Sequence, residues 1–345
     1  MDELALLEGL LKIYSPSYGE QEAVNYLVSA MQEMDYTTFV DEAGNAVCCR
    51  GSGPNEIMLL GHIDTVPGFI VVRREEDMLF GRGAVDAKGP LACFIAAGGR
   101  VTPPQGWRIT VIGAVGEESQ SHGAQFLRDR YKPQAFIIGE PSKWDHITLG
   151  FKGSLWVDYS VQVSMAHTAS GVESAPEAAV RFWNELRTWC DAVNPLGAVP
   201  FNQLTPTLRG MNSSSDGFNE SASLRINLRL PPAITPDSLI ARLHELKGAG
   251  ELKITDLLPA YRAEKNTPLV RAFLSSVRQA GGNPVFSLKT GTSDMNIVAP
   301  VWSCQTVAYG PGNSALDHTP GEYVSIQEYL KSIVVLAEVL AKMCE

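Results

Sequence analysis

Apolar residues recur along both ends of the chain in two patterns, short runs and helical spacing. The runs predict buried strands, and apolar positions at i, i+3 and i+4 predict helices with one buried face. The runs cover 57–60, 107–115, 135–138, 285–288 and 304–308, and the helical segments cover 2–14, 20–34, 91–99, 267–280 and 325–343. This alternation is typical of an α/β fold, and we predict a mixed sheet with helices on both faces.

The middle of the chain has a different pattern. Between 154 and 164, apolar residues occupy every second position, which predicts a strand with one exposed face. Further strands are expected near 204–211, 222–230 and 252–258, and helices over 174–192 and 236–246. We therefore predict a discontinuous first domain, 1–151 and 265–345, interrupted by a small α+β domain over 152–264.

Composition and charge narrow the class of protein. The chain has 345 residues, 45% of them hydrophobic, which is enough for two domains with sizeable cores. Its net charge of −10 argues against nucleic acid and anionic membranes as partners. The six cysteines form no C-x-x-C pair, the N-terminus lacks a signal-peptide pattern, and no apolar run could span a bilayer. These features predict a cytoplasmic protein without a disulfide scaffold or a thiolate zinc site.

Acidic or imidazole side chains follow three of the apolar runs. His62 and Asp64 come after 57–60, Glu117 and Glu118 after 107–115, and Glu140 after 135–138. Residues i and i+2 of an extended chain point the same way, so His62 and Asp64 are expected to face one crevice. Ligand sites of such sheets lie at the carboxyl ends of strands. Each feature alone is compatible with a structural hydrogen bond or a solvated loop, but three together indicate a site.

Two loops add further candidates. The glycine-rich segment 81–90 contains Asp86, and His318 follows the last apolar run by ten residues. The glycine spacing matches neither phosphate-binding fingerprint, and Asp86 is equally compatible with a helix cap. Two histidines and three carboxylates nevertheless suit a pair of Zn²⁺ ions, with one carboxylate as the bridge. The unligated acid of the Glu117–Glu118 pair would move a proton from water to a leaving amine, so we predict amide hydrolysis without a covalent intermediate.

These motifs resemble those of the di-zinc aminoacylase/carboxypeptidase family, which includes acetylornithine deacetylase. The resemblance rests on Gly61-His-Ile-Asp64, Gly81-Arg-Gly-Ala-Val-Asp-Ala-Lys-Gly89, Glu117-Glu118, Gly139-Glu-Pro141 and Asp317-His-Thr-Pro320, in the family's order. It implies two divalent metal ions per chain, Zn²⁺ or alternatively Co²⁺, one held by His62 and Glu140 and the other by Glu118 and His318. It also implies that Asp86 bridges the ions, that Glu117 is the general base, that Asp64 orients His62, and that a cis peptide bond follows Asp86.

The resemblance further implies that the inserted domain is a lid through which the protein forms a homodimer. In this domain, His167 is similar to the family's histidine that stabilises the oxyanion, in its own or the neighbouring subunit; a polar residue at a strand end is the structural alternative. Arg229 is similar to a lid arginine that binds substrate. Asp216-Gly-Phe-Asn219 stands where the family commonly has Asn-Val-Ile-Pro, so different substrate contacts are expected on the lid.

Three stretches, Val40–Ala46, Ile147–Gly153 and Lys289–Asn296, are similar to one branch of the family. Its members release lysine or ornithine from the C-terminal glutamate of a small acidic amino-group carrier protein, in lysine and arginine biosynthesis. In the third stretch the expected donors to the substrate α-carboxylate are Thr290, Thr292, Ser293 and Asn296. Asp294 is expected either to face the ω-ammonium group or to cap a turn. Candidates for a basic patch that docks the carrier are Arg73, Arg74, Arg82 and Lys152.

Two other functions are compatible with the sequence. A small-molecule deacetylase acting on N-acetyl-ornithine or N-acetyl-lysine would use the same metal site without a docking surface. A metal-free binding or scaffolding protein would need none of the ligands, yet every predicted ligand and Glu117 are present. The sequence does not distinguish lysine from ornithine, or a dimer from a tetramer.

Overall fold

The computed structural model describes residues 2–345, which form two compact units. The first unit runs up to Gly150 and resumes with Ala263–Leu288 and Ser293–Glu345, and the second comprises Phe151–Arg262 and Lys289–Thr292. Each unit has a hydrophobic core of its own. Because the chain leaves and re-enters the first unit, candidate residues from both ends of the sequence gather there.

A mixed sheet forms the centre of the first unit. Its strands lie in the order β1-β2-β6-β3-β7-β15-β8, with β14 beside β8. They are β1 (Thr37–Val40), β2 (Ala46–Gly51), β3 (Asn55–His62), β6 (Trp107–Ala114), β7 (Ala135–Gly139), β8 (His146–Phe151), β14 (Val285–Lys289) and β15 (Gln305–Tyr309). The central strands β6, β3, β7 and β15 are parallel, and the outer pairs are antiparallel. The prediction of a mixed sheet is confirmed.

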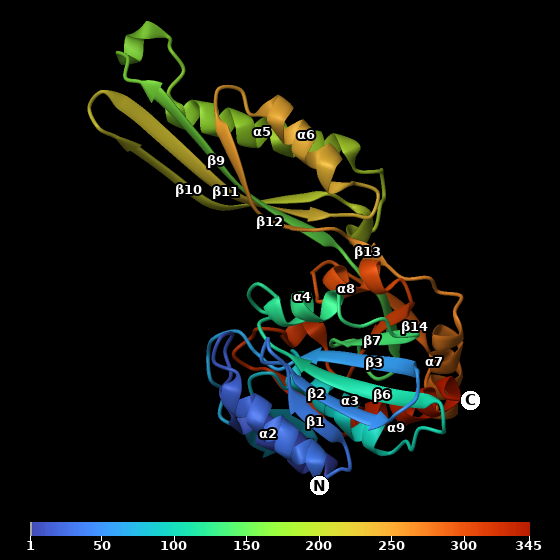
Figure 1. The fold of residues 1–345 in the computed structure, drawn as a ribbon. Helices are drawn as coiled ribbons and strands as arrows, with labels where there is room; N and C mark the ends of the chain where they lie inside the picture. The colour runs from blue at the N-terminus through green and yellow to red at the C-terminus, as the bar shows by residue number, and fades with distance from the viewer. Residues whose placement is uncertain (1) are drawn as a thin grey trace. The chain divides into compact units, whose positions relative to one another are not determined.

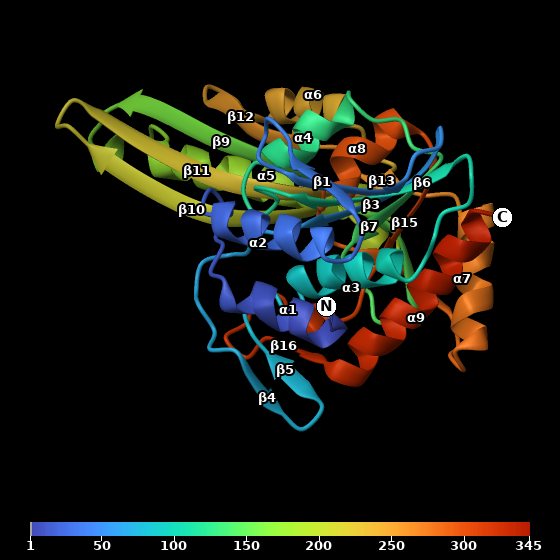
Figure 2. The same cartoon turned by 60° about the horizontal axis from the view of Figure 1, so that its bottom comes forward.

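Helices cover both faces of this sheet (Figure 2). One face carries α1 (Glu3–Lys12), α2 (Gln21–Gln32), α3 (Lys88–Gly99), α7 (Pro268–Gln279) and α9 (Ile326–Met343), and the other carries α4 (His122–Arg128) and α8 (Met295–Trp302). The run Ile57–Leu60 is fully buried, as expected for a strand covered on both sides. Gly61 lets α3 approach closely, because a Cβ added there would lie 3.2 Å from Cβ of Leu91.

A small second sheet of the same unit lies beside the Asp86 loop. Its order is β16-β5-β4, with β16 (Tyr323–Ser325), β5 (Met78–Phe80) and β4 (Arg73–Glu75). Tyr323 pairs with Phe80, and the N–H of Gly81 donates to the carbonyl oxygen of Glu322 at 3.3 Å. This pairing brings Glu322, from the end of the sequence, next to the loop that contains Asp86.

The second unit is an antiparallel sheet with two helices on one face (Figure 1). The strands lie in the order β10-β11-β9-β12; they are β9 (Gly153–Ser164), β10 (Thr205–Ser215), β11 (Asn219–Leu230) and β12 (Glu251–Leu258), and the helices are α5 (Ala175–Val193) and α6 (Pro236–Leu246). A capping box of Ser174 and Glu177 begins α5. Phe182 of α5 stacks on Tyr159 of β9, with ring centroids 4.1 Å apart. This is the expected α+β architecture.

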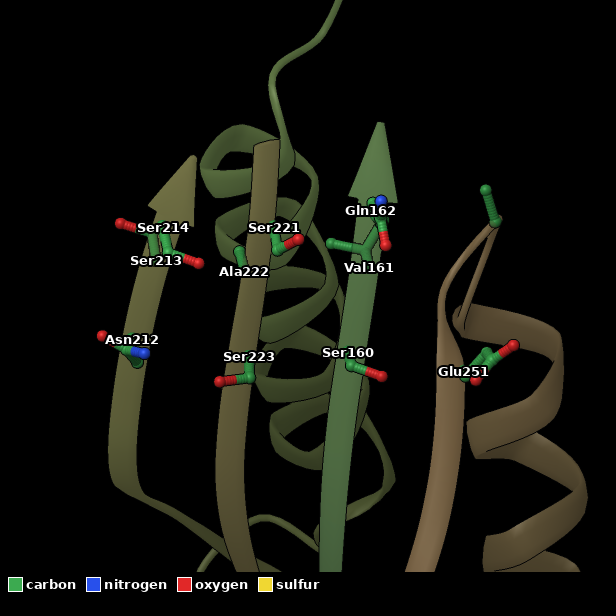
Figure 3. Close-up of a pocket in the computed structure, with 11 residues that line it drawn as sticks. Ser160, Val161, Gln162, Asn212, Ser213, Ser214, Ser221, Ala222, Ser223 and Glu251 are labelled. Carbon is green, nitrogen blue, oxygen red and sulfur yellow. The ribbon is translucent and has the colours of Figure 1, made fainter. Parts of the chain in front are cut away.

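The other face of this sheet is polar. A hollow of about 330 Å³ lies there, and its lining includes Ser160, Asn212 and Ser223, which Figure 3 shows on three neighbouring strands. The period of two along β9 explains the contrast, because Tyr159 and Val161 turn towards the helices and Ser160 and Gln162 turn away. The predicted site residues are not among the side chains that line this hollow.

The apolar pattern does not predict several short elements. These are β4, β8, β16, α4, α8 and β13 (Tyr261–Arg262). Elements this short offer too few positions for a periodicity to appear. Strand β10 also continues to Ser215, beyond the expected end at 211, because its polar residues pair with β11. Over residues 2–345, no helix combines the length and the apolar character needed to cross a membrane.

Candidate metal centre

The side chains predicted at three strand ends converge at one edge of the central sheet. Strand β3 lies between β6 and β7 and is parallel to both, so Gly61 pairs with Gly113 and with Gly139. A Cβ added to Gly139 would lie 3.1 Å from Cα of Gly61, so glycine permits a close approach here. The chain beyond these strand ends carries the candidate His and acidic residues at the carboxyl edge, where α/β sheets bind ligands.

Asp86 connects two histidines that are distant in the sequence. Its Oδ1 lies 3.1 Å from Nε2 of His62, and its Oδ2 lies 3.0 Å from Nε2 of His318. Oε1 of Glu118 lies 2.9 Å from the same nitrogen of His318. Both imidazoles therefore direct Nε2 towards carboxylate oxygens, and the two oxygens of Asp86 point to different histidines. This is the arrangement expected of a carboxylate shared by two metal ions.

Asp64 is fully buried behind these groups. Its Oδ1 accepts the N–H of Glu117 at 3.1 Å, and its Oδ2 accepts the N–H of Glu118 at 3.1 Å and the hydroxyl of Ser17 at 2.7 Å. Nδ1 of His62 lies 2.9 Å from the carbonyl oxygen of Asp64. A carbonyl only accepts, so Nδ1 of His62 carries the proton and a neutral His62 offers Nε2 to a ligand.

Glu117 and Glu140 belong to an acidic cluster, and their surroundings disfavour the ionised form of both carboxyl groups. Burial raises the pKa of Glu117 well above its usual range, and the charge of Asp294 adds to this rise. Burial also raises the pKa of Glu140 well above its usual range, and there the charge of Asp86 adds to it. A cation placed among these carboxylates would reverse both shifts.

The two histidines have raised pKa values as well. Hydrogen bonds to Asp86 and Glu118 raise the pKa of His318 to about 10. Burial alone would lower the pKa of His62, but hydrogen bonds to Asp64 and Asp86 raise it well above its usual range. Without a metal, protons on these rings therefore supply the positive charge that the carboxylates require. Metal binding at this place would release protons.

Two groups of side chains place their ligand atoms within 4.8 Å of one another. One contains Asp86, Glu118 and His318, and the other contains His62, Glu117 and Glu118. Imidazole nitrogens and carboxylate oxygens are donors that Zn²⁺ and Co²⁺ accept, so the residues fit a pair of such ions. The second group differs from the expected pairing of His62 with Glu140, although Glu140 is buried nearby and its pKa responds to the charges of Asp86 and His62.

The loop that presents Asp86 is anchored at its end. The peptide bond between Asp86 and Ala87 is cis, so that prediction is confirmed. Lys88 is buried at the start of α3, and its Nζ donates to the carbonyl oxygens of Leu10 at 3.1 Å and of Ile13 at 2.7 Å. These bonds tie the loop to the end of α1.

The residues expected to bind substrate divide between the two units. In the first unit, Ser293, Asp294 and Asn296 are all buried. The N–H of Ser293 donates to Oδ1 of Asn296 at 2.9 Å, so these two side chains also hold their own turn. Oδ1 of Asp294 has no hydrogen-bond partner among the described residues, and burial raises the pKa of Asp294 to about 7. Asp294 is thus part of the acidic cluster around His62 and Asp64.

The other expected contacts lie in the second unit. Nη1 of Arg229 donates to Oγ1 of Thr292 at 3.3 Å, and burial lowers the pKa of Arg229. Thr290 is exposed. His167 is also exposed, and its Nδ1 accepts the N–H of Ala169 at 3.1 Å at the start of a short 3-10 turn. Nδ1 of His167 is therefore engaged in this hydrogen bond, and Nε2 is the ring nitrogen that does not take part in it.

The prediction of a basic docking patch is wrong for two of its four residues, Arg82 and Lys152. Arg82 is 8% exposed and Lys152 is 1% exposed, so neither can meet a protein partner. Nζ of Lys152 donates inside the second unit to the carbonyl oxygens of Pro200 and Gln203. The other two arginines are partly exposed but neutralised, Arg73 by Glu75 and Arg74 by Glu8. These four residues therefore provide no free basic surface.

Sequence reasoning missed two supports of the centre, the half-buried Ser17 and the buried Glu322. In the sequence, Ser17 belongs to a segment that ends a helix. Its role at the centre is visible only in the structure, where its hydroxyl donates to Asp64. Glu322 follows His318 by four residues, which is the only signal in the sequence. The buried side chain of Glu322 contacts the loop of Asp86, from a part of the chain more than two hundred residues away.

Comparison with known proteins agrees with this geometry. The family model described as Peptidase family M20/M25/M40 matches residues 58–342. A LysW-lysine hydrolase of Deinococcus radiodurans is 41% identical over 347 residues, covering 98% of this chain and 96% of the relative. A putative LysW-lysine/LysW-ornithine hydrolase of Thermococcus kodakarensis is 40% identical over 343 residues, covering 99% of this chain and 92% of the relative.

The fold is also similar to that of solved structures. The Bacillus subtilis YXEP protein, described as a dinuclear metal-binding peptidase from the M20 family, superimposes with a TM-score of 0.74. The match covers 99% of this chain and 97% of that one at 11% identity. Sequence and fold agree, and the chain belongs to peptidase family M20/M25/M40.

Proposed function

We propose that the protein hydrolyses the amide bond that attaches lysine or ornithine to the C-terminal glutamate of an amino-group carrier protein. The observation that carries the proposal is Asp86 placed between Nε2 of His62 and Nε2 of His318, with the half-buried acid Glu117 beside His62. The substrate follows from the relatives, whose names give LysW-lysine and LysW-ornithine as substrates. We propose the same substrates for this chain, in lysine and arginine biosynthesis.

The proposed metal ligands are the five residues named from the sequence. His62 and Glu140 would hold one ion, Glu118 and His318 the other, and Asp86 would contact both; Zn²⁺ is the proposed metal and Co²⁺ the alternative. Ions held there lower the pKa of water and polarise a carbonyl oxygen. The donor set supports this assignment, because a cation offsets the raised pKa values of the buried acids.

Glu117 is the proposed general base. Its carboxylate lies within reach of the ligand atoms of His62 and Glu118, so it faces the place where the amide would be attacked. It would take a proton from the attacking water and deliver it to the α-amino group of the departing lysine. Asp64 would hold Glu117 in position, because it accepts the N–H of that residue.

The second unit is proposed to act as the lid and to form a homodimer. Strand β10 is at one edge of its sheet and offers an unpaired side to a second copy. Arg229 and Thr292, which contact each other within the second unit, would bind substrate, and Thr290 is a further proposed donor on this unit. Ser293 and Asn296 of the first unit are the other proposed donors to the substrate α-carboxylate. Asp294 would face the ω-ammonium group, and the exposed His167 would stabilise the oxyanion in its own or the neighbouring subunit.

The alternative is a small-molecule deacetylase that acts on N-acetyl-ornithine or N-acetyl-lysine. Its support is the absence of a free basic patch at Arg73, Arg74, Arg82 and Lys152, where an acidic carrier was expected to dock. A deacetylase would use the same metal centre and the same base. The two functions therefore differ only in the acyl side of the amide.

A comparison of substrates tests the proposal. The metal-loaded protein would be assayed on carrier-linked lysine, carrier-linked ornithine and their free N-acetyl forms, with release of the free amino acid as the readout. We expect kcat/KM for a carrier-linked form to exceed that for the acetyl forms by at least about a hundredfold, which is about 2.7 kcal/mol of transition-state binding. Equal or higher values for the acetyl compounds would establish the deacetylase instead.

A further inference from the structure

A buried ion pair outside the proposed ligand set supports both loops that carry Asp86 and His318. Glu322 is 0% exposed and Arg82 is 8% exposed, and Nη1 of Arg82 donates to Oε2 of Glu322 at 2.9 Å. Neither side chain is a candidate ligand, and neither contributes to the acidic groups described above. A buried pair needs further partners to offset the loss of hydration, and the bonds of these two side chains identify those partners.

The second carboxylate oxygen of Glu322 collects three backbone N–H groups from the Asp86 loop. Oε1 accepts the N–H of Gly83 at 3.0 Å, of Val85 at 2.9 Å and of Asp86 at 3.1 Å. One oxygen thus fixes the backbone of the loop up to the residue whose side chain lies between the two histidines. Buried N–H groups without a partner are costly, so Glu322 stabilises this shape of the loop.

Arg82 extends the same support to the other histidine. Its Nη1 also donates to the carbonyl oxygen of Thr319 at 3.2 Å, next to His318, and its Nε donates to the carbonyl oxygen of Gly68 at 3.0 Å. The backbone of His318 has φ +60°, a conformation that is uncommon outside glycine and needs support from its surroundings. The bond from Arg82 to Thr319 is one such support.

We infer that Glu322 and Arg82 are positioning residues for the metal centre: together they set the separation between Asp86 and His318, and so the affinity for the ion that these two residues would share. The inference rests on the metal centre proposed above. Such outer partners of a metal site are worth about 10–100-fold in affinity when they are removed. Neither residue would take part in the proton transfers assigned to Glu117.

The test is the affinity for Co²⁺ of metal-stripped protein, followed by the visible absorption of the bound ion and by competition with a chelator. Glu322→Gln keeps the size of the side chain but removes its charge and turns an amide N–H₂ towards Arg82. Glu56→Gln is the matched control: Glu56 is a buried glutamate of the same unit that accepts two bonds from Arg108 and one from Thr110, at the opposite end of β3 from His62.

We expect both substitutions to lower the Tm of the metal-free protein, but only Glu322→Gln to weaken Co²⁺ binding, by about 10–100-fold, and to change the spectrum of the bound ion. Unchanged affinity and spectrum in Glu322→Gln, or an equal loss in Glu56→Gln, would overturn the inference. If Glu322→Gln does not fold, Arg82→Gln breaks the pair from the other side, and wild-type affinity in that variant would overturn it equally. Failure of the wild-type protein to bind Co²⁺ would instead reject the proposed metal centre.

Discussion

The carboxylate of Asp64 accepts the backbone N–H of Glu117 at 3.1 Å, which joins the end of β3 to the loop after β6. Asp64 also contacts His62 through its carbonyl oxygen at 2.9 Å. One buried residue therefore sets the orientation of a proposed ligand and of the proposed base. Asp64 acts through these neighbours, because its own oxygens are occupied by N–H and hydroxyl donors.

Replacement of Asp64 by asparagine tests this role. In Asp64→Asn, an N–H₂ group would meet the N–H of Glu118 or of Glu117, and the negative charge behind His62 would be lost. We expect kcat to fall by about 10–100-fold, the cost typical of losing an outer partner of a metal site. The measurement is kcat together with the metal content of the purified variant.

Ser17→Ala is the matched control for this change. It removes only the hydroxyl donor of Asp64 and leaves the charge and both backbone bonds in place. We expect a loss of less than about tenfold, the effect of one hydrogen bond. A wild-type kcat in Asp64→Asn would show that Asp64 does not organise the centre. A loss of kcat in Ser17→Ala larger than that in Asp64→Asn would contradict the same role, because the hydroxyl would then matter more than the carboxylate.

Removal of the metal ions should make stability depend on pH in a defined direction. Asp294 has its pKa raised from 3.8 to about 7, so the folded protein holds a proton there that the unfolded chain has lost. The stability from this proton is complete below about pH 4 and is lost as the pH rises through 7. The raised pKa values of Glu117 and Glu140 act in the same direction.

We therefore expect the Tm of the metal-free protein to fall by roughly 4 °C between pH 5 and pH 8, which corresponds to about 3 kcal/mol in a chain of this size. The Tm of the metal-loaded protein should change less, because the ions replace the protons. Asp294→Asn should flatten the slope of the metal-free protein. A Tm of the metal-free protein that rises over this range would contradict the assignment of buried, proton-binding acids.

Arg229 provides a test of substrate binding on the second unit. Lysine in place of Arg229 keeps the charge but loses the planar pair of N–H donors that suits a carboxylate. We expect Arg229→Lys to raise KM for the carrier-linked substrate by about tenfold and to change kcat less, because a binding contact common to ground and transition states is weakened.

Arg225→Lys on the same strand is the control. Arg225 is 58% exposed and lies 3.9 Å from Asp158, so the same exchange there should leave both kinetic constants near their wild-type values. Equal effects of the two substitutions would mean that Arg229 serves only the structure of the sheet. The comparison needs the protein loaded with metal, so that the centre itself does not limit the rate.

Much of this arrangement is predictable because strand ends of a parallel sheet meet at one edge. The runs before His62, Glu117 and Glu140 are visible as apolar segments, and their order along the chain places their ends near each other. The α+β character of the second unit follows from the alternation along β9. Asp86 and His318 are candidates by residue type alone, and only the family resemblance assigns each of them a role in the centre.

The remaining features depend on contacts between distant segments. The position of Glu322 beside the Asp86 loop arises from the pairing of β16 with β5, two strands of three residues each. No periodicity exists in such short strands. The burial of Lys152 was likewise hidden, because the side chain reaches carbonyl oxygens fifty residues further along the chain. The sequence does not indicate whether the ammonium group of a lysine will be hydrated at the surface or bound by backbone carbonyl oxygens in the interior.

The most direct test of the proposed hydrolysis is Glu117→Gln, with metal content and turnover measured on the same preparation. Glutamine fills the same space but cannot accept and return the proton. We expect the variant to bind the same number of metal ions as the wild-type protein and its kcat on carrier-linked lysine to fall by about 10²–10⁴-fold. A wild-type kcat with metal bound would contradict the assignment of Glu117 as the base, and loss of the metal would show that it is a ligand instead.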